Sequence, residues 1–272
     1  MLTGWLARWW TAWRLQRQQR VLAERAIPDD LWLDTLRAYP FLTRRPLADL
    51  LHLRELATLF LARKEFSTAG GLALDDTMAV AVAAQACVPV LKLPGGLDLY
   101  DGFVGIVLHP QEVVVPRQWS DEAGVVHSGD EVLAGEAMEG GPVMLSWQDV
   151  QMAGDRARAE DGYNVVIHEF VHVLDMQHGG VDGLPALPDR AMQARWQDVM
   201  PRALLQHQAE VDAEQATWLD PYAAQGPEEF FPVTAEAFFV APEGLQAEFP
   251  EVYALLSAYF GQDPARFQGA RA

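Results

Sequence analysis

Residues 165–183, VVIHEFVHVLDMQHGGVDG, decide the fold, because they place a pair of histidines on a strongly apolar segment. His168, Glu169 and His172 fit the pattern H-E-x-x-H. Residues four apart lie one turn above each other on a helix, so both imidazoles can reach one metal ion while Glu169 lies beside it. Buried imidazoles and carboxylates need polar partners. The pattern predicts a metal centre on a buried helix, and the competing interpretation is a hydrogen-bonded pair in the core.

The chemistry of such a centre follows from its coordination. With zinc as the ion, three protein ligands leave one position open to water, whose pKa the ion lowers toward about 7. Glu169 can then take the proton of this water as a general base and is not itself a ligand. The activated water would attack a carbonyl carbon that the ion polarises, and this reaction hydrolyses a peptide bond. We therefore expect a zinc peptidase in which His168 and His172 bind the metal.

The third ligand has several candidates. His178 would complete H-E-x-x-H-x-x-G-x-x-H, but Asp175 stands where that longer pattern has a glycine, which lets the chain turn sharply. Gly179 and Gly180 instead predict that the helix continues to about residue 177. His178 would then point away from the ion.

A carboxylate from a second helix is the alternative. Gly226 and Pro227 form a credible helix start in residues 219–243, LDPYAAQGPEEFFPVTAEAFFVAPE. Glu229 and Glu236 are seven residues apart and share one face of that helix. The neighbouring Glu228 is a further candidate, so the spacing leaves three carboxylates and one imidazole open.

The rest of the chain predicts helices around a small sheet. Residues 28–64 indicate two or three helices broken at Pro40 and Pro46, and residues 72–93 a buried helix that ends before Pro89. Short strands are expected within residues 103–116 and 126–150. Helices follow at 162–177, 189–216, 227–240 and 244–260. We expect an α+β fold: one mostly helical catalytic unit with a small mixed sheet, a zincin-like helix carrying H-E-x-x-H, and an N-terminal helical layer.

Composition limits the functions open to the chain. Its 272 residues are half hydrophobic, which is enough to bury a sizeable core. The formal charge of −18 would repel a phosphate backbone, so a direct nucleic-acid ligand is not expected. Cys87 is the single cysteine, which rules out an internal disulfide and fits a reducing compartment. We expect a cytoplasmic protein.

The N-terminal segment MLTGWLARWWTAWRLQRQQR is aromatic and basic. Arg8 and Arg14 interrupt it, so it reaches neither the roughly 20 apolar residues of a membrane span nor the apolar core of a signal peptide. Its aromatic residues recur at helical spacing, which predicts an amphipathic helix. That helix could pack on the domain, contact a membrane surface or bind a partner.

Several motifs together resemble one family. HEFVHVLD, DPYAAQGPEEFF and AEAFFVAPE follow each other in the order found in the MtfA family, the Mlc titration factor A zinc peptidases, and LDLYDGF and GPVMLSW extend the likeness. It covers about residues 27–265, which divides the chain into an N-terminal amphipathic helix (1–26), a metallopeptidase domain (27–265) and a C-terminal tail (266–272). The resemblance implies a catalytic core similar to that of lethal factor.

The resemblance also implies roles for particular residues. Glu229 becomes the third zinc ligand, and Tyr222, seven residues before it, lies near the metal and could stabilise the oxyanion. Glu236 and Asp175 become candidates for orienting a ligand imidazole from behind. Pro232, three residues after Glu229, lacks a backbone donor. It therefore predicts that the helix carrying Glu229 begins late or is kinked.

Two functions follow as expectations. The first, implied by the resemblance, is aminopeptidase-like cleavage of small peptides, with binding to a repressor of the Mlc type that controls glucose-uptake genes. The second is a protein-binding regulator that sequesters such a repressor, with a metal that mainly fixes the fold.

Overall fold

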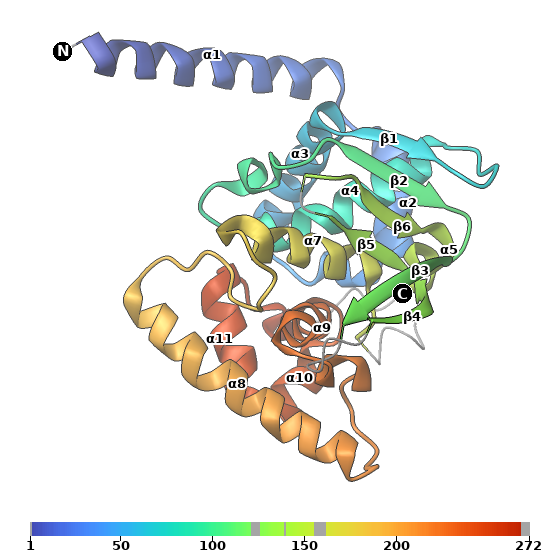
Figure 1. Cartoon of the computed structure of the whole chain (residues 1–272). Coiled ribbons are helices and arrows are strands. Elements are labelled where there is room, and N and C mark those ends of the chain that lie inside the picture. Colours follow the sequence, from blue (N-terminus) through green and yellow to red (C-terminus); the bar gives the residue numbers. More distant parts are fainter. Residues whose placement is uncertain (1, 121–125, 139, 155–161, 268–272) are drawn as a thin grey trace.

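The computed structural model describes the backbone of residues 2–120, 126–138, 140–154 and 162–267, and the side chains of these residues except 2–12, 114–120, 126–133 and 178. Helices predominate and surround a small sheet (Figure 1), which confirms the predicted α+β class. The α-helices are α1 (Leu2–Glu24), α2 (Asp29–Ala38), α3 (Leu47–Arg63), α4 (Asp76–Val90), α5 (Trp147–Met152), α7 (Val165–Asp175), α8 (Arg190–Asp212), α9 (Pro227–Val240), α10 (Pro242–Glu248) and α11 (Pro250–Phe260). Short 3-10 turns are η1 (Pro40–Thr43), η2 (Gly96–Tyr100), η3 (Met176–His178), η4 (Pro221–Ala224) and η5 (Pro264–Arg266).

The main sheet has the strand order β1-β2-β6-β5. Its strands are β1 (Glu65–Thr68), β2 (Gly105–His109), β5 (Gly135–Ala137) and β6 (Val143–Ser146). The first three strands in that order are parallel, with Ile106 opposite Val143, and β5 runs antiparallel to β6 at the edge. A separate antiparallel pair is formed by β3 (Val113–Ser120) and β4 (Val126–Leu133). The sheet is therefore mixed, as predicted, although the sequence analysis did not identify β1.

Helix α7 carries the H-E-x-x-H motif through the interior. Asn164 caps its N-terminus, because the side-chain oxygen accepts a hydrogen bond from the Ile167 N–H at 2.9 Å. Phe170 is fully buried against the rings of Phe60, Tyr100 and Phe103. The helical segment continues past Asp175 into η3, and Gly179, whose φ is +82°, ends it. The predicted continuation to about residue 177 is confirmed.

Helix α9 lies against α7 (Figure 1) and is buried along most of its length. It begins at Pro227, where a proline is tolerated because the first helical N–H has no intrahelical acceptor. It then runs through Pro232 to Val240, so the predicted late start is wrong. Four phenylalanines anchor the helix in the core: Phe230, Phe231, Phe238 and Phe239.

Two predicted helix boundaries near prolines are wrong. Helix α4 includes Pro89 and ends at Val90. Side chains from other elements bond carbonyls near this end: the Tyr100 hydroxyl donates to the Ala86 carbonyl at 2.9 Å, and the Gln262 amide donates to the Val88 carbonyl at 2.8 Å. Residues 244–260, predicted as one helix, form parts of α10 and α11, which meet at Pro250.

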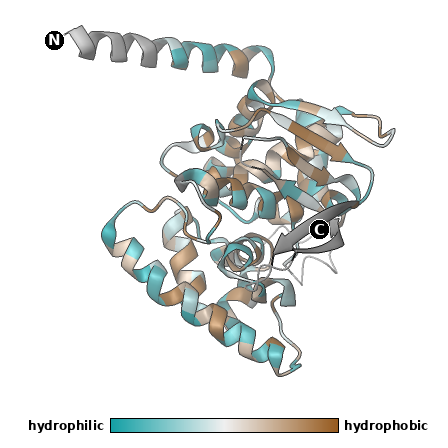
Figure 2. Ribbon diagram, in the orientation of Figure 1, coloured by the Kyte–Doolittle hydropathy of each residue, from teal (hydrophilic) through white to brown (hydrophobic). Residues whose placement is uncertain are grey.

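Helix α8 is a long surface helix. Figure 2 shows mixed teal and brown along it, as expected for a helix with one apolar face. Its buried residues recur at helical spacing: Trp196, Val199, Met200, Ala203, Leu204 and His207. This face packs on α9 and α11.

Helix α1 extends away from the other elements (Figure 1), and it contacts α3. Arg14 on α1 pairs with Asp98 of η2 at 2.6 Å. Among the described helices none has the length and apolar character needed to cross a bilayer. The predicted amphipathic contact of this helix stays a prediction, since the side chains of residues 2–12 are outside the described part.

Candidate metal centre

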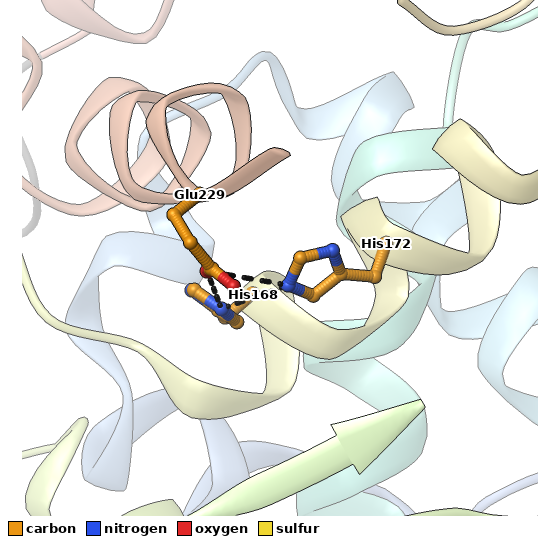
Figure 3. A group of neighbouring side chains, drawn as sticks. All are labelled: His168, His172 and Glu229. Carbon is orange, nitrogen blue, oxygen red and sulfur yellow. Dashed lines mark hydrogen bonds and ion pairs between the residues drawn. The ribbon is translucent and has the colours of Figure 1, made fainter. Parts of the chain in front are cut away.

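Two helices bring three ligand groups together. His168 and His172 lie on α7 and Glu229 on α9, and one ligand atom from each lies within 4.8 Å of the others. Figure 3 shows the three side chains pointing toward one another. Glu229 Oε2 lies 3.2 Å from His168 Nε2 and 3.5 Å from His172 Nε2, and the two Nε2 atoms are 3.1 Å apart. This is the spacing of ligands that share one ion.

The donor set fits a metal ion. Glu229 Oε2, the carboxylate oxygen that faces both imidazoles, is buried without a well-formed hydrogen bond to any described residue. Two imidazole nitrogens that face each other cannot both present lone pairs without repulsion, and buried polar atoms without partners are costly. A cation between the three atoms would accept all three lone pairs. Imidazole nitrogen and carboxylate oxygen are both ordinary zinc ligands.

Glu236 fixes the orientation of the first imidazole. Its Oε1 lies 2.7 Å from His168 Nδ1, and its Oε2 accepts a hydrogen bond from the Asn164 N–H. The Asn164 side chain in turn donates to Gln85 Oε1 of α4 at 2.8 Å. Because the carboxylate accepts a hydrogen bond from the Nδ1–H group, the lone pair of His168 Nε2 is directed at the centre. Glu236 therefore lies in contact with His168, and its role behind a metal ligand stays a prediction.

The charged side chains at this centre shift one another's pKa values. Burial opposes a charged imidazole, but the carboxylates of Glu236 and Glu229 raise the pKa of His168 well above its ordinary value. Burial also opposes the Glu229 carboxylate, but contacts with the two imidazoles hold its pKa far below the usual range. Burial raises the pKa of Glu236. The site therefore stabilises a positive charge at its centre.

Glu169 lies beside this cluster, close enough for the charges of His168, Glu229 and Glu236 to act on its carboxyl group. It is buried, and burial raises its pKa to about 7, with His168 acting in the opposite direction. The Ala137 N–H of β5 donates to its carboxylate. A Cβ atom at Gly135 would lie 2.5 Å from Glu169 Oε1, so only glycine leaves room for the carboxylate. The edge strand therefore holds Glu169 in place.

Tyr222 enters the site from η4. Its ring centroid lies 6.1 Å from that of His168, and 38% of the residue is exposed. Helix α8 holds both ends of this short turn: His207 Nε2 lies 3.1 Å from the Asp220 carbonyl, and Gln208 donates to the Ala224 carbonyl at 2.9 Å. Tyr222 thus lies on a braced turn beside the imidazoles.

A cleft of about 690 Å³ opens onto His168 and Glu169. Tyr222, Trp218 and Gly135 are among the residues that line it. Four further residues at this site were not predicted from the sequence: Gln85, Gly135, Asn164 and Trp218. Asn164 carried a readable signal, because an asparagine just before an apolar helix is a common N-cap, whereas the other three are identified only by tertiary contacts.

The remaining candidates occupy other positions. Asp175 Oδ2 accepts a hydrogen bond from the Gly183 N–H at 2.8 Å, and its Oδ1 has no partner among the described residues. Burial raises the pKa of Asp175 to about 6. The Glu228 carboxylate lies against Gly226. The side chain of His178 falls outside the described residues, so its predicted place remains untested.

Comparisons with known proteins identify the family of the chain. The family described as "Glucose-regulated metallo-peptidase M90" matches residues 11–261. Proteins named Mlc titration factor A are similar over most of the chain. The relative from Serratia proteamaculans (strain 568) is 40% identical over 245 residues, covering 89% of this chain and 90% of the relative. That from Salmonella arizonae is 36% identical over 241 residues (88% and 93%), and that from Pectobacterium atrosepticum 37% over 224 residues (80% and 82%).

Proposed function

The chain belongs to the glucose-regulated metallo-peptidase M90 family, and from this premise we propose that it is a zinc-dependent peptidase whose metal is held by His168, His172 and Glu229. The observation that carries the proposal is the convergence of their three ligand atoms within 4.8 Å. Bound zinc would supply Lewis acidity there, lowering the pKa of a water and polarising a substrate carbonyl.

Glu169 is the proposed general base. Its buried carboxyl has a pKa near neutrality in the metal-free protein, which suits a group that takes a proton from the attacking water and then gives it to the leaving amine. The Ala137 N–H keeps the carboxylate on the cleft side of α7. In this proposal Glu169 transfers the proton from water to the leaving amine, and His168 and His172 hold the metal.

Tyr222 is the proposed donor to the oxyanion. A hydroxyl group beside His168 can hydrogen-bond the oxygen that becomes negative when the carbonyl is attacked, and such a donor contributes more to the transition state than to the bound substrate. The brace from α8 fixes the turn that carries Tyr222. Glu236 keeps His168 in the tautomer that presents Nε2.

The substrate in this proposal is a short or extended peptide. Strand β5 is an edge strand beside Glu169, and an extended peptide can pair with such an edge. Glu112 and Asp220 line the cleft, and their carboxylates would attract the ammonium group of a free N-terminus. These acidic groups support the finer proposal of aminopeptidase-like cleavage.

A second candidate function is favoured by the name of the relatives. Proteins called Mlc titration factor A are 35–40% identical to this chain. We propose that this chain also contacts a transcriptional repressor of the Mlc type. In the alternative form of this proposal, proteolysis is minor and the metal mainly stabilises the contact between α7 and α9.

Replacement of Glu169 by Gln tests the catalytic proposal. Turnover should fall by about 10²–10⁴-fold, because the base is lost while the ligands remain. Zinc content, measured by elemental analysis, and binding to a purified repressor should be unchanged. A peptide-library digest of both proteins shows whether cleavage begins at free N-termini. Hydrolysis retained in Glu169→Gln would remove the mechanism and favour the regulatory alternative.

A further inference from the structure

A second cavity, of about 310 Å³, lies where the start of α3 meets the ends of α4 and α11. Six charged side chains line it: Arg44, Arg45, Asp49, Lys92, Asp263 and Arg266. It shares no lining residue with the cleft at the metal centre. The peptidase proposal gives it no role.

Arg45 is the unusual residue in this cavity. Only 8% of it is exposed, and its Nε and Nη1 atoms have no hydrogen-bond partner among the described residues. Burial lowers its pKa to about 10, although Asp49 acts in the opposite direction. A buried guanidinium normally has a paired carboxylate or a set of acceptors, because leaving it unpaired is costly. Among the described residues the charge of Arg45 is therefore compensated only by the attraction of Asp49, without a hydrogen bond, and Arg45 lines a cavity that an anion could enter.

The other charged groups leave the cavity positive. Asp49 is already paired with Lys92 at 2.6 Å, and Asp263 accepts a hydrogen bond from the Tyr253 hydroxyl at 2.6 Å. Arg44 pairs with Glu243. Arg266 is exposed and forms no ion pair with the described residues. Four cationic and two acidic side chains thus line the cavity of a protein whose formal charge is −18.

The backbone adds to this positive potential. Helix α3 begins beside Arg45, and its N-cap residue, Pro46, provides no side-chain hydrogen bond to the first turn. The first N–H groups of a helix have no intrahelical acceptors, and the helix dipole is positive at this end. Helix α3 has 17 residues, and Pro46 and Asp49 of its first turn line the cavity. Such an end is a common phosphate site.

We infer that this cavity binds the phosphate group of a small molecule, held by Arg45, Lys92 and Arg266 at the N-terminus of α3. Planar guanidinium groups donate in pairs to phosphate oxygens, and a lysine adds a point charge. An anion here would compensate the charges of Arg45 and Arg266, neither of which forms an ion pair with the described residues, and phosphate offers several acceptor oxygens at once. The volume leaves room for a small organic group attached to the phosphate.

The inference is tested by calorimetric titration of the full-length, zinc-loaded protein. The probes are inorganic phosphate and phenyl phosphate, with succinate and chloride at equal ionic strength as controls. We expect saturable binding of one phosphate per chain. Tighter binding of phenyl phosphate identifies an ester as the ligand, whereas tighter binding of inorganic phosphate identifies the free ion, and both results support the site.

Variants locate the binding. Arg266→Glu, at an exposed position, should weaken phosphate binding by at least 10-fold, and Arg45→Lys should weaken it while keeping a charge. Arg37→Glu is the matched control, because Arg37 pairs with Asp34 on the surface and lines neither cavity. Since the readout is binding, it does not depend on peptidase activity. Binding that never saturates, equal binding of succinate, or an unchanged affinity in Arg266→Glu and Arg45→Lys would overturn the inference.

Discussion

Three acidic residues on α9 lie close in sequence but have different surroundings. Glu229 faces both imidazoles, Glu236 lies behind His168, and Glu228 lies against Gly226. The spacing of the residues left all three open, because the rotation of a helix about its axis depends on its packing. The H-E-x-x-H pair needed no such knowledge, since its geometry is contained in one helix. The ligand role of Glu229 itself stays a prediction.

Removal of the Glu229 side chain should therefore remove the metal. We expect Glu229→Ala to lower zinc affinity by at least about 100-fold, the upper range for groups that only support a ligand. Competition with a chromophoric chelator measures this affinity. Glu228→Ala is the matched control and should keep its zinc. If His178→Ala loses the metal while Glu229→Ala retains it, the third ligand is the histidine.

Glu236 tests the support of His168. Glu236→Gln keeps the shape of the side chain but removes the charge that accepts the Nδ1 proton, so zinc affinity should fall about 10–100-fold. The chain should still fold, because the amide oxygen can accept from the Asn164 N–H. Glu248→Gln, at an exposed position on α10, provides the control. Equal zinc affinity in both variants would contradict this role.

At the scale of elements, proline explains most differences between prediction and structure. The long helices were predictable because apolar residues recur with their period, as in α3 and α7. Proline was interpreted as a helix end at Pro89 and overlooked as a helix start at Pro250. A proline is tolerated at a helix start and costs a hydrogen bond inside a helix, so its place in a helix depends on packing that the local sequence does not contain. Strand β1 has only four residues, too few for a periodic signal.

The contact between β5 and α7 gives a prediction at this scale. Gly135→Ala would place a Cβ atom 2.5 Å from Glu169 Oε1, so the carboxylate must move. Turnover should fall about 100-fold, the effect of displacing a reacting group by about 1 Å, while zinc content stays unchanged. Gly102→Ala is the control, because its Cβ would meet no atom within 4 Å. Normal turnover in Gly135→Ala would show that β5 does not position Glu169.

At the scale of the molecule, the predicted α+β class and the resemblance to the MtfA family are both confirmed. The buried polar groups that hold the site together were less predictable, because each takes its partner from a distant segment. Asp175 is an example: it was expected to orient an imidazole, but its described hydrogen bond is to Gly183 in the loop after η3. Its second oxygen has no described partner, so that expectation is not settled by the hydrogen bonds.

Asp175 should make the stability of the metal-free protein depend on pH. Its folded pKa of about 6 exceeds the unfolded value of 3.8, because burial favours the neutral carboxyl. Between these values the folded chain binds more protons than the unfolded chain, so this group lowers stability as pH rises from about 4 to 6. The amide oxygen introduced by Asp175→Asn can still accept a hydrogen bond from the Gly183 N–H. This substitution should therefore avoid a loss of about 1–3 kcal/mol in the free energy of unfolding over this pH range.

Urea unfolding in the presence of a chelator, at pH 4.5 and pH 6.5, measures this effect. The free energy of unfolding of Asp175→Asn should rise relative to the unsubstituted protein between the two pH values. Asp212→Asn, at the exposed end of α8, should show no such difference. A parallel pH dependence of all three proteins would exclude Asp175 as the titrating group.

The contact between α7 and α9 has a consequence for how fast the protein is degraded in the cell. An ion shared by His168 and Glu229 would cross-link two points of the chain that enclose the whole of α8. Such a link removes more conformational freedom from the unfolded chain than from the folded one, and its binding energy adds to folding. Zinc supply would then set the lifetime of the protein against degradation as well as its activity, so scarcity of the metal would lower both together.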